Sequence, residues 1–175
     1  MLHELRLRPL LLEDVDLLVR GSDGEVDAER LRTRLSRSLT LERDGFLELG
    51  IEVAGELVGD VQARCPPHAF PPGVCELGIT LFPEARGRGH GREAVRRFTE
   101  LLFREHAIER VQASTALDNV PMRRLLEGLG WGLEGILRGY FPADGGGRED
   151  YVLYAVTRAE GADGGGGASA PSVVP

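Results

Sequence analysis

A glycine-rich bend, Arg86-Gly-Arg-Gly-His-Gly91, separates an apolar run at 77–82 from a helical pattern at 93–105. A strand, a bend and a helix in this order direct several main-chain N–H groups at one point, where the helix adds its partial positive charge. Glycines let a ligand approach the main chain closely, because no Cβ intervenes. The arrangement predicts a cradle for the phosphates of a cofactor.

Two familiar phosphate-binding motifs do not fit this bend. The dinucleotide fingerprint opens a βαβ unit near the N-terminus, whereas this bend lies in mid-chain after several strand-like segments. A P-loop ends in Gly-Lys-Ser/Thr, and the chain contains no lysine. The pattern that remains is R-x-x-G-x-G, carried by Arg86, Gly89 and Gly91. A plain turn before a helix is the alternative interpretation.

Length and composition set broad bounds. The 175 residues predict one domain over 1–160, followed by a Gly/Ala/Pro-rich tail over 161–175 that we expect to be disordered. No apolar run approaches the length of a membrane span and the N-terminus lacks a signal-peptide core, so we expect a cytoplasmic protein that does not bind membranes. Cys65 and Cys75 are expected to stay reduced, and the chain lacks Cys/His spacing for a metal.

The net charge of −7 argues against nucleic-acid binding. It is compatible with a cationic substrate such as an amine, and equally with a need for solubility alone.

Hydrophobic periodicity predicts an α/β (α+β) domain with a mixed sheet. Alternating or apolar runs predict seven strands, over 3–10, 46–53, 56–64, 74–82, 110–117, 131–137 and 149–156. Apolar stripes at helical spacing predict helices over 13–20, 25–39, 93–105 and 118–130. The pair Ala54-Gly55 predicts a hairpin turn, and four prolines make 65–73 a loop.

Three segments resemble the GNAT family of acyl-CoA-dependent N-acetyltransferases, within a likeness that spans 3–158. Gly78–Gly91 is similar to the family's fourth strand and pyrophosphate loop, Ala116–Asn119 to the strand end with its acyl-CoA-contacting asparagine, and Leu125–Gly135 to its helix-strand segment. The last segment, with Leu-Arg-Gly-Tyr after it, most resembles the branch that includes ribosomal-protein N-terminal acetyltransferases. The resemblance implies a mostly antiparallel sheet of about seven strands flanked by helices, with a V-shaped splay between strands 4 and 5.

The resemblance also implies acetyl-CoA as the cosubstrate. Its pyrophosphate would lie at the loop and the first turn after it, on Arg86, Gly87, Arg88, Gly89, His90, Gly91 and Arg92. Main-chain groups of Ile79, Thr80 and Leu81 would pair with the pantetheine arm like a short added strand, and an N–H near Leu81 would polarise the thioester carbonyl. Asn119 would hydrogen-bond the arm, or would simply cap a helix, or would do both.

Transfer to an amine requires a group that takes a proton from it. Glu76, on the strand that leads into the site, is the candidate base, and Tyr140, just past the sixth strand, is the candidate acid. A solvent-facing glutamate and a packing tyrosine are the alternatives. Many relatives have a tyrosine seven residues after the asparagine, and the ribosomal branch often has a serine three residues after it. Here these positions hold Leu126 and Met122, which donate no proton.

These features together predict transfer of an acetyl group from acetyl-CoA to a primary amine, a protein N-terminus or a small molecule, by direct attack in a ternary complex. Another donor such as succinyl-CoA, a catalytically degenerate acyl-CoA-binding module and a nucleotide-binding protein are the alternatives. A homodimer is common among relatives. Acceptor specificity would lie in the first two helices and the 137–150 loop, where Asp144 would either bind a cationic substrate or serve as a turn residue.

Overall fold

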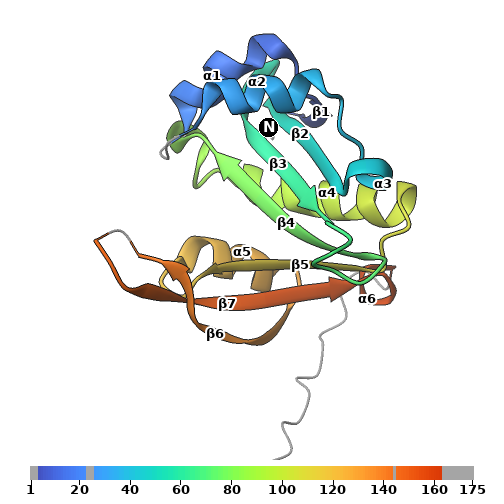
Figure 1. Cartoon of the computed structure of the whole chain (residues 1–175), viewed down its shortest axis with the longest axis vertical. Coiled ribbons are helices and arrows are strands. Elements are labelled where there is room, and N and C mark those ends of the chain that lie inside the picture. Colours follow the sequence, from blue (N-terminus) through green and yellow to red (C-terminus); the bar gives the residue numbers. More distant parts are fainter. Residues whose placement is uncertain (1–3, 23–25, 144, 163–175) are drawn as a thin grey trace, which may run out of the picture.

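The computed structural model describes residues 4–22, 26–143 and 145–162. Seven strands form one sheet in the order β1-β2-β3-β4-β5-β7-β6, and every neighbouring pair is antiparallel except β4 and β5 (Figure 1). The strands are β1 (Leu5–Pro9), β2 (Phe46–Val53), β3 (Glu56–Arg64), β4 (Val74–Leu81), β5 (Arg110–Ala116), β6 (Gly132–Pro142) and β7 (Arg148–Thr157). The predicted mixed, mostly antiparallel sheet is confirmed.

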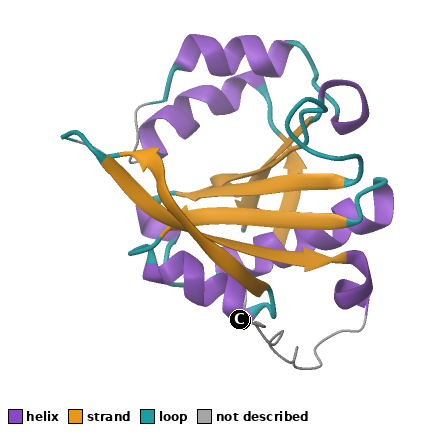
Figure 2. Cartoon of the chain, turned by 60° about the horizontal axis from the view of Figure 1, so that its bottom comes forward, coloured by secondary structure: helices purple, strands orange, loops and turns teal. Residues whose placement is uncertain are grey.

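Helices cover both faces of the sheet (Figure 2). The α-helices are α1 (Val15–Gly21), α2 (Ala28–Ser36), α3 (Leu41–Asp44), α4 (His90–Glu105), α5 (Val120–Gly128) and α6 (Arg158–Ala162), and two 3₁₀ turns are η1 (Leu12–Asp14) and η2 (Pro83–Ala85). Helices α4 and α5 share one apolar core with the sheet, whereas α1 and α2 form a second cluster on the other face with Phe82 of the β4–α4 connection.

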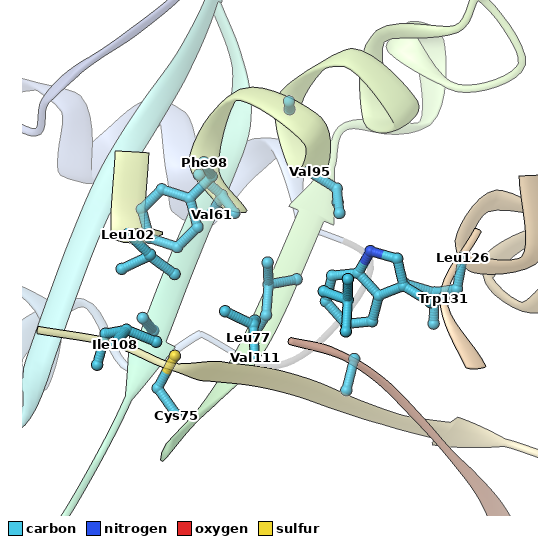
Figure 3. Packing of buried hydrophobic residues seen from close by; sticks show 14 of the residues in the cluster. Val61, Cys75, Leu77, Val95, Phe98, Leu102, Ile108, Val111, Leu126 and Trp131 are labelled. Atoms are coloured by element: carbon cyan, nitrogen blue, oxygen red, sulfur yellow. The ribbon is translucent and has the colours of Figure 1, made fainter. Parts of the chain in front are cut away.

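The main core lies between α4 and the central strands. The stripe of α4 buries Val95, Phe98 and Leu102 completely, and Figure 3 shows these side chains gathered near Val61 and Leu77. Their i, i+3 and i+7 spacing puts them on one side of the helix. This packing holds the N-terminal end of α4, and with it the glycine-rich bend, against the end of β4.

Strands β4 and β5 separate after a short parallel stretch. They pair at Val74–Arg110, Cys75–Val111 and Glu76–Gln112, and then diverge into the V visible in Figure 1. Beyond those residues β4 continues to Leu81 and β5 to Ala116. The predicted splay between strands 4 and 5 is therefore present, and its vertex lies at Glu76.

Several predicted boundaries are wrong. The helix expected over 25–39 is the shorter α2, because Asp27 caps its first turn and Ser38 adopts a positive φ of 46° beyond its end. Helix α4 begins at His90 rather than at residue 93. Of the predicted tail, residues 161–162 belong to α6, and 163–175 lie outside the described residues.

Strand β6 is longer than predicted, and this changes the setting of Tyr140. The strand reaches Pro142 instead of ending at Leu137, so Tyr140 lies within a strand rather than in a loop. A register irregularity between Leu137 and Phe141 absorbs Gly139, whose φ of 57° suits the bulge. Gly139 interrupts the strand pattern in the sequence, yet in the structure it lies inside a bulged strand. Asp144 lies outside the described residues.

Candidate active site

The glycine-rich bend leaves open space above its main chain. Gly87 and Gly89 have φ values of 70° and 84°, and a Cβ added to either would meet nothing within 4 Å. Gly89 is the N-cap of α4 and offers no side-chain cap for the helix. The N–H groups of His90, Gly91 and Arg92 in the first helical turn have no preceding helical carbonyl to bond. The bend and the helix start therefore present main-chain donors to open, accessible space.

The other predicted loop residues are placed differently from Gly87 and Gly89. Gly91 is buried, and a Cβ there would lie 3.1 Å from Leu125 Cδ1, so this glycine permits close packing of α4 on α5. The Arg92 guanidinium donates to the Gly128 carbonyl at 2.6 Å. Arg86 Nε donates to the Leu81 carbonyl at 2.9 Å. Arg88 is exposed and His90 is half-buried beside the bend.

The register of β3 and β4 decides which main-chain groups face the splay. The Phe82 N–H donates to the Val58 carbonyl at 2.9 Å, so Phe82 faces β3. Because main-chain groups alternate along a strand, those of Leu81 and Ile79 face the splay. Thr80 lies opposite Asp60, with its main chain toward β3. Ile79 and Leu81 therefore lie on the edge of β4 that faces the splay, where the Leu81 carbonyl accepts from Arg86, and Thr80 is tied to the neighbouring strand.

Asn119 lies at the start of α5, across the splay. Its side-chain oxygen accepts from the Met122 N–H at 3.2 Å, and its amide donates to Thr115 Oγ1 at 2.9 Å. The helix-cap interpretation is thus confirmed. A contact with a cofactor arm stays a prediction, which the second amide hydrogen of the exposed side chain allows.

Glu76 lies at the vertex of the splay. Ser114 Oγ on β5 donates to its carboxylate at 2.8 Å, and Arg64 Nη2 lies 3.6 Å from its other oxygen. The Glu76 side chain is only 16% exposed, so it is not an ordinary solvent-facing glutamate. The sequence did not point to Ser114. The residue continues the polar positions of β5 after Arg110 and Gln112, and this alternation was the available signal.

The structure does not bring Tyr140 to Glu76. Tyr140 is exposed on the β6–β7 hairpin, where its ring centroid lies 5.5 Å from that of Tyr151. Met122 is partly buried against the main core, and Leu126 is fully buried. The two positions of α5 where many relatives carry a hydroxyl therefore contribute only to packing.

A cleft of about 590 Å³ lies between the α1–α2 pair and the polar face of β2, β3 and β4. Glu48, Asp60, Gln62 and Thr80 come from these strands. The remaining lining residues come from the helices, their connections and the end of β4, and they are Leu18, Ser22, Val26, Asp27, Arg30, Leu31, Thr33, Arg34, Arg37, Leu39 and Phe82. Polar strand residues thus share the cavity with apolar side chains and with Arg30, Arg34 and Arg37.

Two carboxylates of the cleft lie in a desolvated setting. Arg34 of α2 holds Glu48 with two hydrogen bonds of 3.0 and 2.7 Å, while burial raises the pKa of Glu48 above its usual range. Burial and then the charge of Glu48 raise the pKa of Asp60 to about 7, against the opposing effects of Arg34 and of a hydrogen bond with Thr80. A raised carboxyl pKa in a cavity is a common property of functional sites.

The sequence analysis missed this cleft. Polar residues at alternate positions of three strands, namely Glu48, Asp60, Gln62 and Thr80, were the signal for a polar sheet face. Within the described ranges, no group of three or more His, Cys, Asp or Glu side chains is suited to hold a metal ion. Among the same residues, no helix has the length and apolar character needed to span a membrane.

Comparison with known proteins agrees with this geometry. The acetyltransferase (GNAT) domain model matches residues 4–131. An uncharacterized N-acetyltransferase p20 of Bacillus licheniformis is 27% identical over 157 residues, which cover 82% of this chain and 87% of that protein.

Two solved structures have the same fold. A chimera of the spermidine N-acetyltransferase SpeG from Vibrio cholerae and hSSAT has a TM-score of 0.80 at 18% identity, over 91% of this chain and 99% of the other. RimJ of Mycobacterium smegmatis, in complex with CoA-disulfide, has a TM-score of 0.76 at 22% identity, over 89% of this chain and 83% of the other. With a family model that covers most of the domain, the chain belongs to the GNAT acetyltransferase family, whose members transfer acyl groups to amines.

Proposed function

We propose that the protein transfers an acetyl group from acetyl-CoA to a primary amine by direct attack in a ternary complex. The observation that carries this proposal is the open, glycine-lined helix start that adjoins the edge of β4 facing the splay. A Cβ at Gly87 or Gly89 would occupy the space that a diphosphate needs. The residues present therefore fit the cosubstrate, and the CoA found with RimJ supports the assignment.

In this proposal the main chain of residues 87–92 holds the diphosphate, with Arg86, Arg88 and Arg92 adding positive charge around it. The edge of β4 at Ile79 and Leu81 pairs with the pantetheine arm, and Asn119 bonds it from the other side of the splay. Thr80, paired with β3, holds the neighbouring residues Ile79 and Leu81 in position for the arm. Bound acetyl-CoA supplies an activated thioester, whose carbonyl the N–H of Ile79 or Leu81 would polarise.

Glu76 is the proposed proton acceptor for the amine, and Ser114 orients it. Its place at the vertex, largely buried and held by two partners, supports this role more than that of a surface charge. Tyr140 remains the candidate proton donor, and it would act from the β6–β7 hairpin. The reaction does not depend strictly on a donor, because a thiolate is a stable leaving group.

The acceptor amine is proposed to enter through the cleft between α1–α2 and the sheet. The cleft adjoins β4 on the face that carries Glu76, Gly78 and Thr80, which alternate with the core residues of that strand. Its lining includes both first helices, where we expected acceptor specificity. Membership of the family alone leaves the identity of the acceptor amine open.

The purified protein, incubated with acetyl-CoA and a panel of amines, tests the proposal through release of free thiol. We expect amine-dependent thiol release and a mass gain of one acetyl group on the acceptor. Turnover with succinyl-CoA but not acetyl-CoA would instead assign the larger donor. CoA binding without thiol release from any donor and amine would identify a degenerate binding module, and affinity for ATP or NAD without CoA binding would identify a nucleotide-binding protein.

A further inference from the structure

The cleft contains a carboxylate, that of Asp60, whose nearby arginine is hydrogen-bonded to another acid. The charged groups that act on Asp60 are Glu48 and Arg34, and Arg34 directs its Nε and Nη2 donors to Glu48. Two carboxylates at the floor of the cavity therefore share one arginine. Asp60 has a hydrogen bond with Thr80, which satisfies part of its polarity but adds no positive charge. A cationic group from a ligand would complete this arrangement.

Asp60 is too far from Glu76 to serve the same nitrogen atom. Asp60 lies opposite Thr80, and Glu76 precedes Thr80 by four residues on β4. At a rise of about 3.3 Å per residue, the two positions are about 13 Å apart. Side chains stand roughly perpendicular to a sheet, so their carboxylates stay comparably separated. An acceptor that uses both needs two cationic centres.

The wall of the cleft beside Asp60 is apolar in part. Leu18, Leu31 and Phe82 are buried residues that also line the cleft, and they belong to the cluster between α1, α2 and the sheet. Such a surface suits a chain of methylene groups, and about 590 Å³ lies in the range of small-molecule sites. Arg30 of α2 and the residues that flank this helix, Asp27 and Arg37, also line the cleft, but they are exposed and water screens their charges.

We propose that the acceptor is an aliphatic diamine or polyamine, and that Asp60 binds its second ammonium group while the first is acetylated. This inference rests on the proposed function and names the substrate class of the same site. The ionised carboxylate is the form that pairs with a cation. Because its pKa is about 7, binding of a dication strengthens as the pH rises through neutrality, while the ammonium groups keep their protons until about pH 10.

The test compares 1,4-diaminobutane and longer diamines with monoamines of equal chain length, for the wild type and Asp60→Asn. We expect the diamine KM to lie about tenfold below that of the monoamine, as for one charge-assisted hydrogen bond. Asp60→Asn should raise the diamine KM to the monoamine value, while kcat changes less than about twofold. Glu56→Gln, an exposed acid on the same strand outside the cleft, is the matched control and should change neither constant.

A second variant keeps Asp60 in place. Glu48→Gln frees Arg34 to pair with Asp60, so it should also raise the diamine KM. Equal KM values for diamines and monoamines, or an unchanged diamine KM in Asp60→Asn, would overturn the proposal, as would selective acetylation of a peptide N-terminus that is insensitive to Asp60. If no amine is acetylated, calorimetric titration of diamine into the CoA complex decides separately. If the wild type binds the diamine and Asp60→Asn does not, the diamine site is supported even though the proposed function fails. If the wild type does not bind the diamine, the diamine site is overturned as well.

Discussion

The Ser114 hydroxyl on β5 donates a 2.8 Å hydrogen bond to Glu76 on β4, just where the two strands begin to diverge. The bond crosses the vertex of the splay and fixes the carboxylate that we propose as proton acceptor. Its neighbour Arg64 lies 3.6 Å away on the other side. Glu76 is thus held from both adjacent strands.

Glu76→Gln should lower kcat by about a hundredfold or more near neutral pH, because the amide accepts no proton in the reaction. CoA affinity should stay at the wild-type value, since the loop is distant along the strand. Ser114→Ala should lower kcat by a smaller factor, because it leaves the carboxylate in place but less ordered. Steady-state kinetics across the pH range check both variants. Wild-type rates for Glu76→Gln at every pH would remove this residue from the mechanism.

The order of helices and strands along the chain and the position of the loop could be predicted because their signals are local. The bend at Arg86–Gly91 lies beside its own strand and helix, and the hairpin at Ala54-Gly55 joins adjacent strands. Local composition was therefore enough to predict the loop to which we assign the cosubstrate. Helix ends were less certain, since the three residues before position 93 read as loop by composition and fold as the first turn of α4.

The side-chain contacts in the cleft that we propose for the acceptor could not be predicted, because they join distant segments. Arg34 and Glu48 meet across 14 positions, and Ser114 reaches Glu76 across 38. Asp60 becomes notable only when β3 pairs with β4 and α2 lies over Glu48. Each of these residues is unremarkable in its own segment, and register places them together.

Asp60→Asn should stabilise the folded protein at pH 8. The pKa of Asp60 is about 7 in the folded state and near its ordinary 3.8 in the unfolded chain, so the folded state holds the proton more tightly. Stability therefore falls as the pH rises from about 4 to 7, and the cost of the buried charge is complete above that range. Removing it should gain roughly 2–4 kcal/mol.

Thermal or urea denaturation at several pH values measures this gain. The difference between Asp60→Asn and the wild type should shrink toward pH 4, where both side chains are neutral. A variant that is less stable than the wild type at pH 8 would show that Asp60 is a structural residue rather than a site that sacrifices stability for binding.

Arg8 should be essential for stability, because it neutralises a buried acid. Its guanidinium holds Asp14 through bonds of 2.7 and 2.9 Å and Glu52 through one of 2.9 Å, and the Asp14 side chain is 5% exposed. Arg8→Met should lower the free energy of unfolding by about 3–5 kcal/mol. The double variant Arg8→Met/Asp14→Leu should recover most of this loss, as urea denaturation can measure.

The same ion pair predicts a pH dependence of opposite sign to that of Asp60. The hydrogen bonds from Arg8 hold the pKa of Asp14 below its ordinary value of 3.8. Its contribution to stability is therefore present above about pH 4 and is lost as the pH falls through the folded-state pKa. An acid-denaturation midpoint that moves upward in Arg8→Met would agree with this account, and an unchanged midpoint would contradict it.

The loop assignment is tested most directly by calorimetric titration of CoA into the wild type, Gly89→Val and Gly55→Val. The two glycines are a matched pair, with φ values of 84° and 85° and no atom within 4 Å of an added Cβ, so valine strains both backbones alike. Gly55 lies in the β2–β3 turn, away from the proposed cradle. We expect wild-type affinity in Gly55→Val and no measurable binding in Gly89→Val, with equal losses of thermal stability. Undiminished CoA affinity in a folded Gly89→Val protein would contradict the claim that this loop holds the cosubstrate.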